Sequence, residues 1–98
     1  MSTRAILIQH GLTLARAIGY DRVSRSLAAE AAGVSQALVS YYWPSGIEAY
    51  HAEIMESAVA AGDLEVVAQG LVAPIHPVAA AAPVELRRAA AALIVGEG

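Results

Sequence analysis

Residues 24–43 restrict the fold more than any other part of the sequence, because small residues stand there at the spacings that two closely packed helices require. Ala29 is small enough for a second helix to pack across the first at a steep angle. Gly33, four residues later, tolerates the positive φ that a three-residue turn between helices needs. Val34 supplies a buried residue in that turn, and Val39 lies on the inner face of the second helix. The segment therefore predicts a helix-turn-helix.

Capping residues predict where the helices around this turn begin. Ser2 or Thr3 can cap a first helix that runs to about residue 18, where Gly19 ends it in a left-handed conformation. A short connection follows, and Ser24 or Ser26 can cap the helix that leads into the turn. The N-terminal part of the chain is therefore expected to hold two helices before the turn.

Two further helices are expected between the turn and Gly62. Ser35 can cap a short third helix that ends before Pro44, because a proline disfavours the helical conformation of the preceding residue. Ser45 and Glu48 have the spacing of a capping box for a longer fourth helix, which Gly62 ends. The helical spacing predicts a buried face on the fourth helix that consists of Ile47, Tyr50, Ile54, Ala58 and Ala61.

The chain beyond this fourth helix is richer in proline. A short helix is expected over residues 64–71, and an extended connection with three prolines over residues 73–83. Pro83 is well placed to start a last helix over residues 84–95, which Gly96 ends. Branched residues never alternate with polar ones over a useful length, so no strand is expected and the predicted fold class is all-α.

The length and the charge distribution define the predicted organisation. The 98 residues fit one compact domain, and a hydrophobic content of 57% is too high for a disordered chain. We expect residues 1–45 to form a three-helix helix-turn-helix head, and residues 46–98 to form a longer connecting helix and a short helical dimerisation segment. The net charge is −3, but residues 1–45 carry +2 and residues 46–98 carry −5. This asymmetry is expected if only the front of the molecule meets phosphate.

Several function classes find no support in the sequence. There is no cysteine, which suits a reducing cytoplasm, and no apolar run reaches the roughly 18 residues that a membrane span needs. The N-terminus lacks a signal-peptide pattern. His10, His51 and His76 stand apart from one another, so no metal site is expected. Glu53 and Glu56 are interpreted as a solvated helix face, and no phosphate loop or nucleophile motif is present, so we expect neither a cofactor nor an enzyme.

Three short motifs occur within residues 4–50. They are Gly-Tyr-Asp at 19–21, Ala-Gly-Val-Ser at 32–35 followed by Leu38 and Val39, and Tyr-Trp-Pro-Ser at 42–45. In this combination, residues 4–50 resemble the DNA-binding domain of the tetracycline-repressor (TetR) family. The resemblance implies a homodimer that binds a palindromic operator on double-stranded DNA, usually as a repressor.

The resemblance also implies which residues meet DNA. Gln36 has a donor and an acceptor that suit adenine, and Ala37 can contact a thymine methyl group. Tyr42 can pack its ring inward while its hydroxyl reaches phosphate, and Trp43 is expected in the core. The expected base contacts are Gln36, Ala37, Ser40 and Tyr41. The expected phosphate contacts are Arg4, Arg22, Arg25, Ser35 and Tyr42.

The apolar residues after Ala58 exceed what a small three-helix head can cover. They are Val66, Val67, Leu71, Val72, Ile75, Val78, Leu86, Leu93 and Ile94. Left exposed, they would form a larger patch than soluble monomers usually tolerate, so a homodimer is expected. Its predicted interface contains Leu71, Leu86, Ala90, Leu93 and Ile94. The chain is too short to enclose a pocket of roughly 300 Å³ and keep a core, so no small-molecule effector is expected.

Two alternatives remain open at this point. The chain has only six cationic side chains, and Gly46 stands where the TetR family commonly has a basic residue. These features favour a protein-docking module that uses a degenerate helix-turn-helix. The other alternative is a fragment or decayed copy of a longer regulator. Steep salt dependence of DNA binding would separate the first alternative from a DNA-binding regulator.

Overall fold

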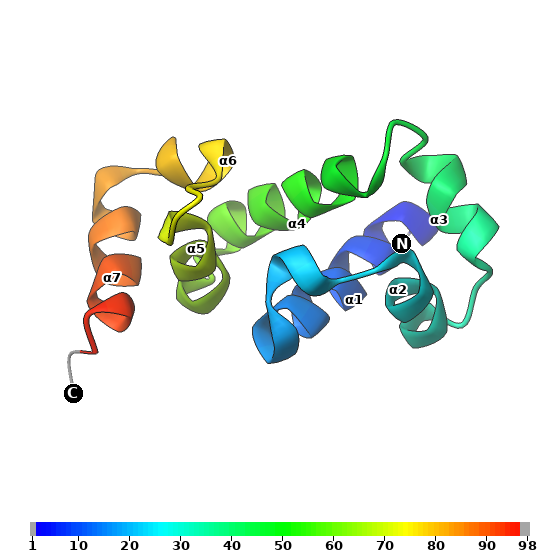
Figure 1. The fold of residues 1–98 in the computed structure, drawn as a ribbon, viewed down its shortest axis with the longest axis horizontal. Coiled ribbons are helices and arrows are strands. Elements are labelled where there is room, and N and C mark those ends of the chain that lie inside the picture. The colour runs from blue at the N-terminus through cyan, green and yellow to red at the C-terminus, as the bar shows by residue number, and fades with distance from the viewer. Residues whose placement is uncertain (1, 97–98) are drawn as a thin grey trace.

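The computed structural model describes residues 2–96, and every regular element within that range is helical. The elements are α1 (Thr3–Ile18), the 3-10 turn η1 (Tyr20–Arg22), α2 (Arg25–Ala32), α3 (Gln36–Tyr42), α4 (Ile47–Ala61), α5 (Leu64–Leu71), α6 (Pro77–Ala80) and α7 (Val84–Ile94). The molecule measures 40 × 26 × 23 Å along its principal axes. Figure 1 shows α2 and α3 at one end of the long axis and α7 at the other. The all-α prediction is therefore confirmed.

Local capping chemistry sets most of the helix ends. The hydroxyls of Ser2, Ser24 and Ser35 each accept a hydrogen bond from the backbone N–H three residues later, which satisfies a donor that the first turn leaves free. Gly33 and Gly62 end α2 and α4 in the left-handed conformation, with φ of 71° and 68°. These boundaries agree with the sequence-based prediction.

The start of α4 differs from the prediction. Gly46, with φ 133°, precedes the helix, and no side chain caps its first turn. The backbone N–H of Gly46 donates to the carbonyl oxygen of Trp43 (3.3 Å), so Ser45 lies inside a tight turn, one residue too early to act as a cap. The predicted capping box of Ser45 and Glu48 is therefore wrong. Ala61, predicted to be buried, is exposed in the last turn of the helix.

The proline-rich connection also differs from the prediction, because part of it is helical. Pro77 occupies the first turn of α6, where the missing N–H of proline costs nothing. The Nδ1 atom of His76 accepts a hydrogen bond from the backbone N–H of Val78 (3.1 Å) and so caps this short helix. A proline that was interpreted as part of an extended segment therefore starts a helix.

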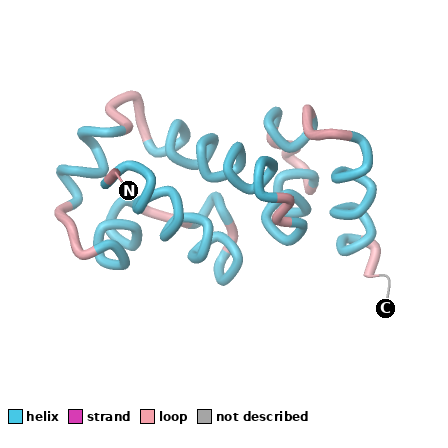
Figure 2. The backbone as a smooth tube through the Cα atoms, turned by 180° about the vertical axis from the view of Figure 1, so that it is seen from behind, coloured by secondary structure: helices cyan, strands magenta, loops and turns pink. Residues whose placement is uncertain are grey.

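The centre of the fold is α4, which packs on α1 and, near its C-terminal end, on α5 and α6 (Figure 2). Gly11 allows the close approach of α1, because a Cβ atom there would lie 2.6 Å from both the Tyr50 hydroxyl oxygen and the Ile54 Cδ1 atom. The Tyr50 hydroxyl donates to the carbonyl oxygen of Leu7 (2.6 Å). Buried side chains of α4 thus hold α1, which in turn supports the segment with the predicted turn.

Candidate nucleic-acid interface

The helices α2 and α3 pack on each other through small and branched side chains. Ala29 and Val39 are buried at their contact, and Val34 is partly buried in the turn. The backbone N–H of Val34 donates to the carbonyl oxygen of Ala29 (3.0 Å), which closes the turn around Gly33. The spacing of these residues therefore produces the two helices and the tight turn that it predicted.

The outer face of α3 is presented to solvent. Gln36, Ala37 and Tyr41 are exposed, and Tyr41 keeps 74% of its surface accessible. Ser40 is partly buried, so it is less accessible than the other three predicted base-contacting residues. Side chains of this kind at the start of a capped helix can reach base edges when the helix enters a major groove.

Two cations flank the start of α2. Arg22 is exposed at the end of η1, and Arg25 is partly buried in the first turn of α2. Among residues 2–96, neither guanidinium forms an ion pair with an acidic side chain. Ser35 uses its hydroxyl oxygen to accept from the N–H of Leu38 (3.2 Å), which leaves its hydroxyl proton available to another acceptor. These three side chains can meet phosphate without breaking a contact seen in the structure.

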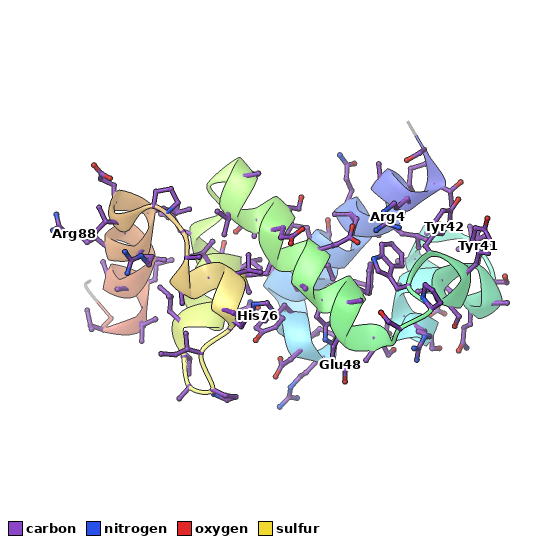
Figure 3. The ribbon with its side chains drawn as sticks, turned by 90° about the horizontal axis from the view of Figure 1, so that it is seen from above. Arg4, Tyr41, Tyr42, Glu48, His76 and Arg88 are labelled. Carbon is purple, nitrogen blue, oxygen red and sulfur yellow. The ribbon has the colours of Figure 1, made fainter. Side chains whose placement is uncertain are left out.

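Arg4 is in a different situation from the other predicted phosphate contacts. Its guanidinium forms an ion pair with Glu53 and donates to the backbone carbonyl oxygen of Tyr42 (3.2 Å). It also lies over the ring of Trp43, with 4.8 Å between the guanidinium carbon and the ring centroid. The sequence predicted that Arg4 contacts phosphate, whereas in the structure its guanidinium has three intramolecular partners. Figure 3 shows Arg4 close to Tyr42 at the end of α3.

Glu53 is the residue of this region that sequence reasoning missed. Its interpretation as part of a solvated face is wrong, because Oε2 accepts both from Arg4 and from the indole Nε1 of Trp43 (2.9 Å). No local signal could have revealed this, since Arg4 and Glu53 are 49 residues apart in the sequence. The exposed Glu56, one turn later on α4, has no side-chain hydrogen bond or ion pair within the described range.

Three consecutive aromatic residues mark the end of α3. Trp43 is only 2% exposed and packs against Tyr50, with 4.6 Å between ring centroids, which confirms its predicted place in the core. Tyr42 is partly buried against the core, and its ring meets that of the exposed Tyr41 edge to face at 5.2 Å. The inward packing predicted for the Tyr42 ring is thus observed.

The histidines are less isolated than the sequence suggested. The ring of Tyr20 meets the rings of two of them edge to face, with its centroid 6.1 Å from that of His51 and 5.5 Å from that of His76. The Nε2 atom of His51 lies 2.7 Å from the carbonyl oxygen of Val23, so it carries a proton and donates. Within residues 2–96, no three His, Asp or Glu side chains gather in a way that could hold a metal ion.

The residues predicted to form a dimer interface divide into three groups. Leu93 and Ile94 are exposed on α7, and Leu71 and Leu86 are partly buried. Ala90 is fully buried within the subunit, so its prediction as an interface residue is wrong. The side chains of Val66 and Val67 are also fully buried, because α5 packs on α4, α6 and α7, which together cover apolar surface that was predicted to be open.

An open apolar groove of about 310 Å³ remains between α5 and α7. Its lining consists of Glu65, Ala68, Gln69, Val72, Leu93 and Ile94. A second open groove, of about 460 Å³, runs between α4 and α6. Both grooves are surface features and not enclosed cavities.

No protein-family model, curated protein or solved structure matches this chain. Across the part of the chain that the structure describes, no helix is long and apolar enough to cross a membrane.

Proposed function

We propose that the protein is a sequence-specific DNA-binding transcriptional regulator, a repressor that binds a palindromic operator as a homodimer. The observation that carries this proposal is the outer face of α3, which is exposed at one end of the molecule while its inner face packs on α2. The three motifs that resemble the TetR family support the same function and a TetR-like arrangement of the first helices. The absence of cysteine suits action in a reducing cytoplasm.

In the proposed complex, α3 lies in the major groove of double-stranded DNA. Gln36 reads adenine through its amide group, and Ala37 contacts a thymine methyl group. Ser40 and Tyr41 contact a neighbouring base or phosphate from the same face. Arg22, Arg25, Ser35 and Tyr42 hold phosphates on either side of the groove, which fixes the position of α3 without reading the sequence. No cofactor, metal or chemical step is involved.

The proposed homodimer uses the end of the molecule opposite to α3. Val72, Leu93 and Ile94 leave an apolar surface on α5 and α7 that a second copy of the chain would cover. Two copies joined there present two α3 helices, which matches two half-sites about one helical turn or more apart. This arrangement needs no small-molecule effector.

The test starts with selection of bound duplexes from a random DNA library. Gln36→Ala is then expected to cost about 1–3 kcal/mol on the selected operator, mainly at one base pair in each half-site. Arg25→Ala should weaken all sequences alike and reduce the salt slope by about one. Arg88→Ala is the matched control, because it removes the same charge from an exposed position on α7. Arg88 lies at the end of the molecule opposite to Tyr41 (Figure 3). If Gln36→Ala leaves the base preference unchanged, the assignment of the reading face is wrong.

A protein-docking module is the second candidate function. The observation in its favour is the engagement of Arg4 by Glu53, which leaves few free cations near α3 in a chain of net charge −3. A docking surface does not release counterions from DNA, so its binding need not depend steeply on salt. Wild-type protein that selects no duplex and shows no salt-dependent DNA binding would favour this candidate over the regulator.

A further inference from the structure

The orientation of α3 depends on contacts at both of its ends. The helix has only seven residues, and its main packing partner is α2. Its N-terminal end is held by the turn at Gly33 and by the Ser35 cap. Its C-terminal end is contacted by side chains from α1 and α4, so those two helices decide how firmly that end is held.

Three side chains provide this hold. Arg4 on α1 donates to the carbonyl oxygen of Tyr42, the last residue of α3 (3.2 Å). Glu53 on α4 binds Arg4 and accepts from the indole nitrogen of Trp43, which directly follows α3 (2.9 Å). The guanidinium also covers the Trp43 ring. We refer to Arg4, Glu53 and Trp43 as the α3 clamp.

The charge of Glu53 distinguishes two roles for Arg4. If Arg4 were held in reserve for phosphate, Glu53 would compete with DNA for it and would also repel the DNA backbone. If Arg4 instead holds α3, the carboxylate of Glu53 supports that role. Glu53 then fixes the C-terminal end of α3 through Arg4, and it fixes Trp43 directly. Charge-assisted hydrogen bonds of this kind are stronger than neutral ones and impose a defined geometry.

We propose that Arg4 and Glu53 are positioning residues that fix the C-terminal end of α3, and that Arg4 is not a phosphate contact. The proposal rests on the proposed DNA-binding function for its consequence, since a poorly held α3 presents Gln36 and Tyr41 in several orientations. Only specific binding requires one orientation. Loss of the clamp therefore reduces affinity for the operator more than affinity for unrelated DNA.

The decisive experiment compares Glu53→Gln with Glu56→Gln. Both variants remove one negative charge from α4. Glu53→Gln also removes the ion pair with Arg4, but its amide keeps an oxygen that can accept from the Trp43 indole. Glu56 holds no such contact within the described range. We expect Glu53→Gln to bind the selected operator about three- to tenfold more weakly than Glu56→Gln. Equal or tighter binding by Glu53→Gln would mean that the carboxylate does not position α3 or that it competes with DNA for Arg4, and either result would overturn the proposal.

Arg4→Ala tests the other partner through its salt dependence. A positioning residue that touches no phosphate leaves the salt slope of operator binding unchanged, although the affinity falls. A phosphate contact reduces the slope by about one when it is removed. A reduced slope in Arg4→Ala, matching that of Arg25→Ala, would overturn the proposal.

Two measurements without DNA separate failure of the clamp from failure of the proposed function. Trp43 is the only tryptophan of the chain, so its fluorescence reports directly on the indole contact. Glu53→Ala should shift the emission of Trp43 and speed amide exchange at the end of α3, while Glu56→Ala should do neither. If wild-type protein binds no DNA but these local changes occur, the regulator proposal fails and the clamp stands. If emission and exchange are the same in both variants, the clamp itself is refuted.

Discussion

The helices before Gly62 and those after it are held together by different means. Within α1–α4, polar side chains link helices that are far apart in the sequence, such as Tyr50 to the carbonyl oxygen of Leu7 and Arg4 to Glu53. Over residues 62–96, every hydrogen bond that a side chain forms within the segment spans five residues or fewer. There the core that α5, α6 and α7 share consists mainly of alanine and valine side chains, with Leu64, Leu71 and Leu86 partly buried against it.

The two regions also differ in the apolar surface that they leave open. Large hydrophobic side chains are exposed at three positions in α1–α4, namely Ile18, Leu27 and Tyr41. They are exposed at six positions after Gly62, namely Val72, Ile75, Val84, Leu93, Ile94 and Val95. Three of these six, Val72, Leu93 and Ile94, line the groove between α5 and α7, and clustered exposure of this kind marks surfaces that bind a partner. The comparison indicates that α1–α4 complete their packing within one subunit, whereas α5–α7 leave a surface that fits the proposed second copy.

The largest effect is expected from a charge placed on that surface. Leu93→Asp should weaken self-association at least about a hundredfold, because a carboxylate would be buried without a partner in the proposed interface. Leu27→Asp on α2 is the matched control, since Leu27 is also an exposed leucine, at 36% against 50% for Leu93. Sedimentation equilibrium of the two variants provides the measurement. A wild-type chain that stays monomeric at micromolar concentration would contradict the proposed homodimer.

A methyl group added at a close helix contact should affect the two regions unequally. In Gly11→Ala, the new Cβ atom would meet Tyr50 and Ile54, which are both fully buried. We expect the free energy of unfolding to fall by about 2 kcal/mol, once the higher helix propensity of alanine is included. In Gly70→Ala, the nearest atoms are at 2.7 Å and belong to the flexible Met55 and to Ala79 on the short α6, which can shift. The free energy of unfolding of Gly70→Ala should therefore fall by less than about 1 kcal/mol. Urea unfolding of both variants tests the comparison, and equal losses would show that α6 is held as rigidly as α4.

Removal of the Tyr50 hydroxyl should have a smaller effect, confined to the contact of α1 with α4. Tyr50→Phe loses the hydrogen bond to Leu7 and should cost about 1 kcal/mol at neutral pH. Burial raises the pKa of Tyr50 to about 12 from its ordinary value of 10.0. Because the folded state holds this proton more tightly than the unfolded state, the wild type should lose stability as the pH rises above 10.0 towards 12. Tyr50→Phe should lack this part of the alkaline loss, which unfolding at a series of pH values would measure.

The smallest effect is expected at the junction of the two regions. The pKa of His76 is lowered from 6.5, chiefly by burial and then by the nearby His51, while Glu56 acts in the opposite direction. Tyr20, whose ring meets that of His76 edge to face, is the other titratable group there. Protonation also removes the Nδ1 acceptor that caps α6. Since the folded state disfavours the proton, this contribution to stability is present above pH 6.5 and is lost as the pH falls through the lower folded pKa.

His76→Asn should keep a capping oxygen for α6 and abolish this acid-side loss of stability. His10→Asn on α1 serves as the control, because no aromatic contact of His10 is present in the described structure. Thermal unfolding between about pH 5 and 7, the range in which histidine titrates, is the measurement. If His76→Asn and wild type show the same pH dependence, the junction does not respond to His76.

The positions at which most helices begin and end could be predicted from local sequence patterns. The serines that cap α1, α2 and α3, and the glycines that end α2 and α4, act on backbone groups within four residues of themselves. Such interactions are short in sequence as well as in space, so they can be predicted without knowledge of the fold. The predicted cap at Ser45 failed for the opposite reason. The turn that contains Ser45 begins at Trp43, whose position depends on its burial in the core.

The contacts between side chains across the molecule could not be predicted in this way, because they depend on how the helices pack. Arg4 and Glu53 are 49 residues apart, and the ring of Tyr20 contacts two histidines that are themselves distant in sequence. Burial of Ala90 depends likewise on how α7 packs on α5. The physical reason is that ion pairing and burial depend on distances in space, and these are set by the packing of whole helices, for which no residue near Arg4 or Ala90 in the sequence carries a signal.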